Sequence, residues 1–420
     1  FNNNGRKQMS NNLNFITFGC KLNAFETQVM KEKAEGYFLT NHSFINSCAV
    51  TNEAVKQSRR AIRKEKKDNP TNKIVVTGCA AELYPSEFID MPEVDIIIGN
   101  DDKTKSSTFM NLAQIDGADN EVIELTHEDP PFINTFDNRT RAFVQIQNGC
   151  DHRCTFCIIP YARGNSRSLD ERHIIKQIQT LIDKGYQEII LTGVDITSYG
   201  KDLNDETNLG ILIKNIIKKT NNLKRLRISS IDSIEIDDDF LEVFSSEEVI
   251  MPHLHLSLQS GNDLILKRML RRHQTLDAVK FCERIQKIRP DTVFGADMIA
   301  GFPTETDDMH RSTMQHINDC DITYLHVFPF SSKTGTPASK MPQVEKNIIQ
   351  SRAKDLRTLG MQKMNLFLMK EIGKEKAILL EKQGFGRTEQ YSKVIINEVG
   401  NPGEIIKKKI IGISKDQLIA

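Results

Sequence analysis

The 420-residue sequence has no long apolar run, no apolar leader and no net charge. A transmembrane helix needs about 18 or more apolar residues, so none is predicted, and the polar residues 1–8 lack the core of a signal peptide. Lys and Arg number 56 and balance 56 Asp and Glu, so any contact with nucleic acid must come from local basic patches. We therefore expect a cytoplasmic protein with no membrane partner.

The composition is that of an ordinary globular protein, and its cysteines are the informative feature. Hydrophobic residues make up 39% and charged residues 27% of the chain, whose length suits two or three domains. There is no internal repeat and no biased tract beyond the Asn-rich first dozen residues. Eight cysteines in a reducing compartment indicate metal binding or catalysis rather than disulfides.

Three cysteines stand together as Cys150, Cys154 and Cys157, with the spacing C-x3-C-x2-C. One short loop can aim all three thiolates at a common point. Three ligands are one fewer than a closed zinc site or a fully ligated iron–sulfur cube requires, which indicates reaction at the metal. The spacing is typical of radical S-adenosylmethionine (SAM) enzymes, in which the open iron of a [4Fe–4S] cluster binds SAM. The alternative is a structural zinc site completed by a distant Cys or His.

Residues 12–116 alternate between short apolar runs and longer polar-faced segments. The expected strands are 15–18, 43–46, 73–77 and 94–98, and the expected helices are 24–37, 52–68, 82–91 and 102–115. This alternation predicts an N-terminal α/β domain with a parallel sheet.

Cys20, Cys48 and Cys79 each follow one of the first three predicted strands. The carboxyl ends of parallel strands lie along one edge of a sheet, where ligand sites form. We therefore expect the three thiols to converge, and Gly19 and Gly78 to let the backbone pack closely beside a bulky group. Three unrelated core cysteines are the alternative.

The remainder of the chain divides into three parts. Residues 117–138, with Pro130-Pro131 and little periodicity, are predicted to be a linker. Residues 139–372 contain six strand–helix units, which favours a partial (β/α)6 barrel with its site at the carboxyl ends of the strands. Short apolar alternations separated by glycines over 373–420 predict a small all-β barrel.

At this point the residues resemble the radical SAM methylthiotransferase family over nearly the whole chain. The motifs that carry the resemblance are Gly149–Gly164 with its Ile158-Ile159-Pro160-Tyr161-Ala162-Arg163-Gly164 segment, Gln259-Ser260-Gly261, and Gly301–Thr306. The last residues are similar to the TRAM RNA-binding domain. Thr17–Asn23, Cys48–Thr51 and Thr192–Gly200 resemble the MtaB type within the family.

The MtaB resemblance implies transfer of sulfur and a methyl group to C2 of N6-threonylcarbamoyladenosine at tRNA position 37. Two related targets stay open, namely N6-isopentenyladenosine in tRNA and an aspartate of ribosomal protein S12. An alternative of another class is an RNA-binding iron–sulfur electron-transfer protein. The open position in the cysteine loop disfavours it, because electron carriers normally close all four positions.

The resemblance also implies two [4Fe–4S] clusters and SAM as cofactors. Cys150, Cys154 and Cys157 would hold the cluster that cleaves SAM, and Cys20, Cys48 and Cys79 an auxiliary cluster that presents sulfur. A second SAM would supply the methyl group. The cofactors supply the difficult chemistry, while the protein positions them and excludes water.

Further candidate cofactor contacts are weaker. Phe156 is expected over the adenine of SAM, and Arg163 near a phosphate or the SAM carboxylate. By position near strand ends, the remaining candidates are Ser229, Ser230, Gln259 and Asp297, for which plain structural support is the alternative. The expected partners are the tRNA anticodon loop and an electron donor such as flavodoxin or ferredoxin, with the enzyme itself a monomer.

Overall fold

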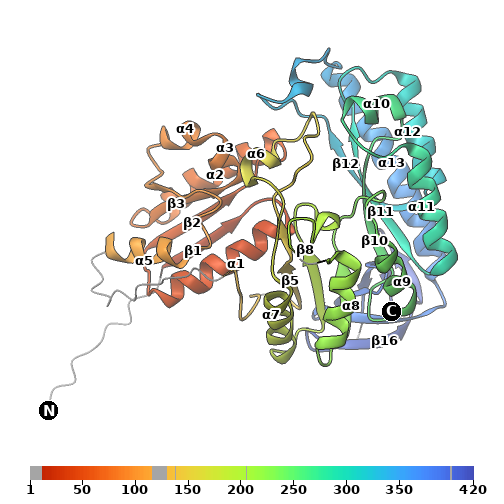
Figure 1. The fold of residues 1–420 in the computed structure, drawn as a ribbon, viewed down its shortest axis with the longest axis horizontal. Helices are drawn as coiled ribbons and strands as arrows, with labels where there is room; N and C mark the ends of the chain where they lie inside the picture. The colour runs from red at the N-terminus through yellow and green to blue at the C-terminus, as the bar shows by residue number, and fades with distance from the viewer. Residues whose placement is uncertain (1–11, 116–129, 138, 205, 398–399) are drawn as a thin grey trace. The chain divides into compact units, whose positions relative to one another are not determined.

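The computed structural model describes residues 12–115, 130–137, 139–204, 206–397 and 400–420. The chain forms two compact units, of which the first contains Phe1–Ile133 and Tyr161–Arg163 and the second Asn134–Pro160 and Gly164–Ala420. Each unit is described by itself (Figure 1). Most of the expected linker 117–138 lies outside the described residues, and its described part, 130–137, contains no helix or strand.

The first unit is a four-stranded parallel sheet with helical connections, which confirms the predicted α/β class. Its elements are β1 (Leu13–Thr17), α1 (Lys21–Gly36), β2 (His42–Ser47), α2 (Asn52–Asp68), β3 (Lys73–Gly78), α3 (Cys79–Leu83), α4 (Pro85–Ile89), β4 (Ile96–Ile97) and α5 (Ser106–Ile115). The strand order is β1-β2-β3-β4, so neighbours in sequence are neighbours in the sheet. The register places Thr17 beside Asn46 and Ser47 beside Gly78, which aligns the carboxyl ends of the first three strands.

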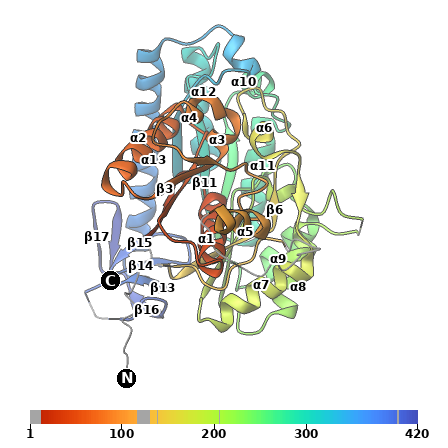
Figure 2. The ribbon, with the colours of Figure 1, turned by 90° about the vertical axis from the view of Figure 1, so that its left-hand side faces the viewer.

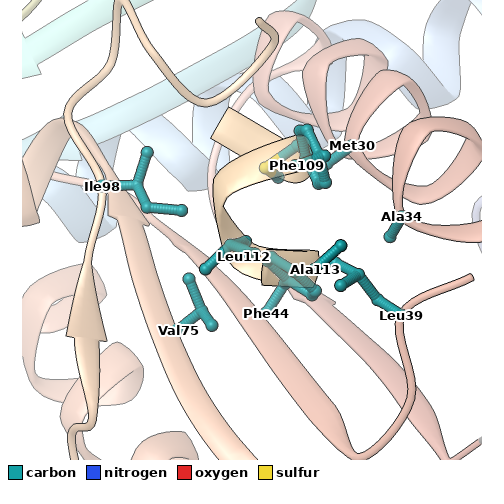
Figure 3. Close-up of a cluster of buried hydrophobic side chains, with 9 residues drawn as sticks. All are labelled: Met30, Ala34, Leu39, Phe44, Val75, Ile98, Phe109, Leu112 and Ala113. Carbon is teal, nitrogen blue, oxygen red and sulfur yellow. The ribbon is translucent and has the colours of Figure 1, made fainter. Parts of the chain in front are cut away.

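A buried apolar cluster fixes this sheet against its helices (Figure 3). Phe44 of β2 and Val75 of β3 pack with Met30 of α1 and with Phe109 and Leu112 of α5. Each large side chain buried in this way contributes about 1.5–3 kcal/mol relative to exposure. The cluster therefore holds the strands, and with them the loops at their carboxyl ends, in fixed positions.

In this unit the expected helix 102–115 begins only at Ser106, and two further expected elements differ in the structure. The predicted helix 82–91 is two short helices, because Pro85 occupies the first turn of α4 and Tyr84 before it is non-helical, with φ −131° and ψ 53°. The predicted strand 94–98 shortens to Ile96–Ile97. Neither change moves the three strands that carry the cysteines.

The second unit begins with a series of parallel strands joined by helices. Its elements are β5 (Arg141–Gln145), β6 (Gln147–Asn148), α6 (Ile159–Arg163, whose last three residues belong to the first unit), β7 (Arg167–Ser168), α7 (Glu171–Asp183), β8 (Glu188–Thr192), η1 (Ile196–Ser198), α8 (Leu209–Lys219), β9 (Arg225–Ile228), α9 (Asp238–Ser246), β10 (His253–Gln259), α10 (Asp263–Arg268), α11 (Thr275–Ile288), β11 (Val293–Ala300), α12 (Asp307–Asp319), β12 (Ile322–Pro329), η2 (Pro337–Lys340) and α13 (Lys346–Glu371). Parallel sheets β5-β8-β9 and β10-β11-β12 are joined by a bridge between Ile231 and Leu256. The six strands thus follow one another in chain order, as a partial barrel requires. None of the described helices, α13 included, is long and apolar enough to cross a membrane.

The chain ends in an all-β sheet, as predicted (Figure 2). Its strands are β13 (Glu375–Lys382), β14 (Phe385–Thr388), β15 (Lys393–Ile395), β16 (Ile405–Lys409), β17 (Gly412–Ser414) and β18 (Gln417–Ile419), in the order β16-β13-β14-β15-β18-β17. Leu368 of α13 packs into the core of this sheet beside Ile378, Val394 and Leu418. Helix α13 also contacts the barrel, where the rings of Phe367 and of Tyr324 on β12 lie 6.2 Å apart between centres, so it links the sheet to the barrel.

Buried charges also join the C-terminal sheet to the amino ends of the barrel strands. Arg227 donates to both carboxylate oxygens of Glu188, at 2.9 and 3.2 Å, and its guanidinium lies 4.8 Å from the ring centre of Tyr391. Arg225 lies beside the same carboxylate and donates to the carbonyl oxygen of Ala377, at 2.8 Å. The C-terminal sheet therefore contacts the amino ends of these strands. The cysteine loop lies after β5, on the carboxyl side, where a ligand site is expected.

Candidate active site

The loop of the first cysteine trio, Cys150–Cys157, is held by its own backbone. Cys150 N donates to Gly164 O at 3.1 Å, and Cys157 N donates to Cys154 O at 3.0 Å. Gly149 has φ +74°, and a Cβ there would lie 1.9 Å from Asn165 O. A glycine is therefore required where the chain enters the loop.

The electrostatic environment of this loop favours a bound cation. Burial raises the pKa of the Cys150 thiol to about 12, and Asp195 and the other two thiols of the trio add to that rise. Close by, His152 Nε2 lies 2.9 Å from Asp195 Oδ2 and 3.4 Å from Glu235 Oε2, and these carboxylates raise the pKa of His152 to about 9. Thiols that oppose one another's ionisation become thiolates when a metal supplies the positive charge. The carboxylate partners of His152 were not predicted from the sequence.

The second trio is assembled from three strand ends of the first unit. Cys20 caps α1, Cys48 directly follows β2, and Cys79 begins α3. A Cβ on Gly19 would lie 2.7 Å from Cys48 Sγ, and one on Gly78 would lie 2.3 Å from Ser47 O, so both glycines are needed for this close packing. The expectation that these cysteines occupy one edge of the sheet agrees with where the structure places them.

Neither cysteine trio has the close spacing of a single zinc site, although Cys150 belongs to a tighter group with His152 and Asp195, whose ligand atoms all lie within 4.8 Å of one another. In a tetrahedral zinc–thiolate site, neighbouring sulfur atoms are about 3.8 Å apart, given Zn–S bonds of about 2.3 Å. Neither cysteine trio is among the groups of described residues whose ligand atoms all lie within 4.8 Å of one another. Thiols spread more widely suit a cluster, whose several irons separate the ligands.

Arg163 has partners other than those expected from its position after the cysteine loop. It is buried in the first unit, where Nη1 and Nη2 donate to the two Glu26 oxygens at 2.7 and 2.9 Å and Nη2 also donates to Asn23 Oδ1 at 2.6 Å. The expectation that it holds a phosphate or the SAM carboxylate therefore does not match its surroundings. The physical reason is that Tyr161–Arg163 packs with the first unit, although it directly follows the loop of the second.

The other predicted SAM contacts lie in the second unit. Phe156 is partly buried and meets the edge of Phe302, with ring centres 6.4 Å apart. Ser229 and Ser230 directly follow β9. Gln259 ends β10 with φ +69°, at an irregularity in the pairing with β11. These positions suit ligand contact and structural support alike.

Asp297 belongs to a group that sequence reasoning did not recognise. His255 Nε2 lies 2.9 Å and His326 Nδ1 3.3 Å from Asp297 Oδ1, so three neighbouring strands each supply one member. Burial would raise the pKa of Asp297, but His255 and His326 hold it well below its usual range. A Cβ on Gly295 would lie 2.5 Å from His255 Nδ1, so that glycine leaves room for the ring. The alternation of His255 with apolar neighbours along the strand was the available signal. The ligand atoms of the three side chains all lie within 4.8 Å of one another, so the group can orient the imidazoles, share a proton or hold a metal ion.

Two families match the chain. Residues 144–317 match the Radical SAM superfamily, and residues 12–99 match a family described as Uncharacterized protein family UPF0004. The first match covers the cysteine loop and most of the barrel strands. The second covers the sheet that carries Cys20, Cys48 and Cys79.

Among curated proteins, this chain is similar to tRNA methylthiotransferases over nearly its whole length. It is 44% identical to the threonylcarbamoyladenosine tRNA methylthiotransferase MtaB of Rickettsia prowazekii, over 97% of each chain. It is 37% identical to the MtaB of Bacillus subtilis, over 94% of this chain and 93% of that one. Identity to the tRNA-2-methylthio-N(6)-dimethylallyladenosine synthase of Bartonella henselae is 30%, over 96% and 94%.

Among solved structures, the chain is similar in fold to the radical S-adenosylmethionine methyltransferase TsrM of Kitasatospora setae. The TM-score is 0.55 at 12% identity, and the match covers 79% of this chain and 75% of that one. At this identity the likeness concerns the fold alone. Because it is 44% identical to a tRNA methylthiotransferase over 97% of each chain and matches the Radical SAM superfamily, this chain belongs to the radical SAM methylthiotransferase family.

Proposed function

We propose that this chain transfers a methylthio group to C2 of N6-threonylcarbamoyladenosine at position 37 of tRNA, next to the anticodon. The observation that carries the proposal is the 44% identity to the Rickettsia prowazekii MtaB over 97% of both chains. The dimethylallyladenosine synthase of Bartonella henselae matches over a similar length at only 30%. That difference supports the threonylcarbamoyl substrate over the isopentenyl one.

Each cysteine trio would hold one [4Fe–4S] cluster. Cys150, Cys154 and Cys157 stand after the first barrel strand, and Cys20, Cys48 and Cys79 stand at the sheet edge of the first unit. When bound, the clusters and SAM supply radical chemistry, sulfur and the methyl group, which are needed because the C2–H of adenine is not acidic enough for an ordinary side-chain base. The chain itself binds, orients and shields these groups.

The barrel residues would position SAM and the base. Phe156, braced by Phe302, offers an aromatic surface for the adenine of SAM. Ser229, Ser230 and Gln259 offer polar groups at the ends of β9 and β10. Asp297 would act through His255 and His326 rather than by direct contact with SAM. We keep Arg163 out of the set of SAM contacts because Glu26 occupies its guanidinium.

The proposed partners follow from the substrate and the chemistry. The anticodon loop of tRNA brings phosphates, and Lys407 and Lys409 are exposed on β16, the edge strand of the C-terminal sheet. Exposed lysines there suit phosphate contact as well as protection of the strand edge. A one-electron donor such as flavodoxin or ferredoxin is required for the cluster that cleaves SAM. We further propose that the enzyme acts as a monomer in the cytoplasm.

Mass spectrometry of nucleosides from tRNA tests the substrate. A strain that lacks this enzyme and any other of its type should lose 2-methylthio-N6-threonylcarbamoyladenosine and accumulate the unmodified precursor, and the gene on a plasmid should restore the product. If that nucleoside persists and the 2-methylthio-isopentenyl nucleoside disappears, the related substrate is the correct one. If both persist, the target lies outside these tRNA nucleosides.

Anaerobic reconstitution tests the reaction class. The purified chain should bind about eight irons, as two [4Fe–4S] clusters require, and form 5′-deoxyadenosine from SAM with dithionite. If the chain binds iron but does not cleave SAM, the electron-transfer alternative is favoured.

A further inference from the structure

A buried group of charges lies beneath the cysteines of the first unit. Lys103 is 0%, Glu26 2% and Arg163 3% exposed. Lys103 Nζ lies 2.6 Å from one Glu26 oxygen, and Arg163 binds the same carboxylate through two hydrogen bonds of 2.7 and 2.9 Å. One carboxylate therefore serves two cations.

This group also donates hydrogen bonds to amide side chains. Lys103 donates to Asn100 Oδ1 at 2.8 Å and to Asn46 Oδ1 at 3.4 Å, and Arg163 donates to Asn23 Oδ1. Amide oxygens complete the hydrogen bonding but bring no negative charge. The group thus carries one net positive charge out of contact with water, an arrangement that proteins avoid unless a counter-charge is near.

The nearest source of that counter-charge is the cysteine trio. Burial lowers the pKa of Lys103, and Glu26 is the strongest group that opposes this, followed by the sulfur of Cys79. For Arg163, burial is again opposed first by Glu26 and then by Cys79, with Cys20 also contributing. The contacts agree with this. Lys103 donates to Asn46 Oδ1, which lies 2.6 Å from where a Cβ on Gly78, the residue before Cys79, would be. Arg163 donates to Asn23 Oδ1, and Nδ2 of the same amide donates to the carbonyl oxygen of Ser47, the residue before Cys48. One amide side chain therefore separates each cation from a residue that adjoins a cysteine. Glu82, the other carboxylate near Asn100, is exposed to solvent.

We propose that Lys103 and Arg163, bridged by Glu26, supply one buried positive charge that balances the negative charge of the auxiliary cluster held by Cys20, Cys48 and Cys79. The inference rests on the proposed function, in that it takes this trio as the ligands of the second cluster. The two cations are positioning residues, because they act on the cluster through its electrostatic environment. A positive charge there favours the more negative, reduced state, so it raises the midpoint potential of the cluster and helps to retain the cluster.

A purely structural role would give the same contacts, so the test must separate charge from packing. Lys103→Met reduces the net charge of the group from +1 to 0, and so does Arg163→Met. Lys103→Met with Glu26→Gln removes both partners of one ion pair and restores +1 through Arg163 alone. If charge matters, the double variant resembles the wild type, whereas if the contacts alone matter it is worse than either single variant.

The variants are made in a chain whose first trio is replaced by alanine (Cys150, Cys154 and Cys157), so that one cluster remains. EPR-monitored redox titration gives its midpoint potential, and iron release to a chelator gives its retention. We expect both single variants to shift the potential downward and to release iron faster, and the double variant to return towards the parent on both measures. Lys105→Met is the matched control, because Lys105 lies two residues away in an exposed pair with Asp102 and should change neither measure.

An unchanged potential in Lys103→Met, or a lower potential in the double variant than in the single one, overturns the proposal. If Lys103→Met holds no iron, the double variant decides: retention supports the charge argument, and loss refutes it. The parent with the first trio replaced should bind about four irons. If the parent binds none, the assignment of the trio, and with it that part of the proposed function, is wrong for a separate reason.

Discussion

The two cysteine trios are placed by different parts of the fold. Cys150–Cys157 spans eight residues of one loop, whereas Cys20, Cys48 and Cys79 span sixty residues and depend on three parallel strands ending at one level. The first site is fixed by local backbone hydrogen bonds and the second by the packing of a whole sheet. A local site can be recognised from spacing alone, while a dispersed one becomes visible only when the topology is considered.

The largest contrast between the trios should appear when the local one is broken. Cys154→Ala removes a central ligand of the cluster proposed to cleave SAM, so formation of 5′-deoxyadenosine and of methylthiolated tRNA should both fall below detection. Anaerobic assays with dithionite, followed by chromatography of the nucleosides, measure both products. Substantial 5′-deoxyadenosine from this variant would contradict the role given to the loop.

Breaking the dispersed trio should remove only one of the two activities. Cys48→Ala leaves the cysteine loop intact, so SAM cleavage should continue near the wild-type rate while sulfur insertion into tRNA stops. The same assay reports both quantities. Circular dichroism confirms that the sheet has folded. Loss of both activities in a folded variant would mean that the two trios do not act separately.

A backbone substitution tests how strictly the local loop is built. Gly149→Ala places a methyl group 1.9 Å from Asn165 O at φ +74° and should cost about 3 kcal/mol or more, with loss of iron from the loop. Gly185→Ala is the matched control, because Gly185 also has a positive φ, +95°, but its Cβ would have no neighbour within 4 Å. That variant should cost only about 1–2 kcal/mol. Urea unfolding and iron content are measured for both variants. If both lose the same free energy of unfolding, the backbone around Gly149 has shifted to make room for the methyl group.

The charges beneath the dispersed trio give the smallest and most pH-dependent effect. Burial opposes ionisation of Glu26, yet Arg163 and Lys103 bring its pKa down from 4.5 to about 2, which corresponds to about 3 kcal/mol of stability. Because the folded-state pKa is lowered, this contribution is full above pH 4.5 and disappears as the pH falls towards 2. Glu26→Gln should therefore destabilise the metal-free protein at pH 7 by about 3 kcal/mol, and by less at pH 3.5.

Urea unfolding at both pH values checks this expectation. Asp102→Asn is the comparison, since its exposed pair with Lys105 should be worth less than about 1 kcal/mol. If Glu26→Gln reduces the free energy of unfolding more at pH 3.5 than at pH 7, the lowered pKa of Glu26 is contradicted.

The parallel N-terminal sheet, the barrel series, the C-terminal β sheet and the strand-end positions of Cys20, Cys48 and Cys79 were accessible from the sequence, because periodicity and strand-end position are local properties. The positions of the buried charged side chains could not be predicted from the sequence. Lys103 lies near the start of the expected helix 102–115, within the polar run Asn100–Ser107, yet in the structure it precedes α5 and is completely buried. Arg163 follows the cysteine loop in sequence but pairs with Glu26, 137 residues away. Pairings of this kind depend on which segments pack together, and residue patterns do not encode that.

The arginines around Glu188 have a consequence for how the chain can be shortened. Arg225 and Arg227 reach from the floor of the barrel to the main chain of the last domain, at Ala377 and Glu389. A chain ending near residue 372 would leave these guanidinium groups crowded around a single carboxylate and facing solvent that the native fold excludes. The C-terminal sheet therefore supports the barrel and is also a candidate RNA-binding surface, so loss of activity on its removal would not by itself identify an RNA contact.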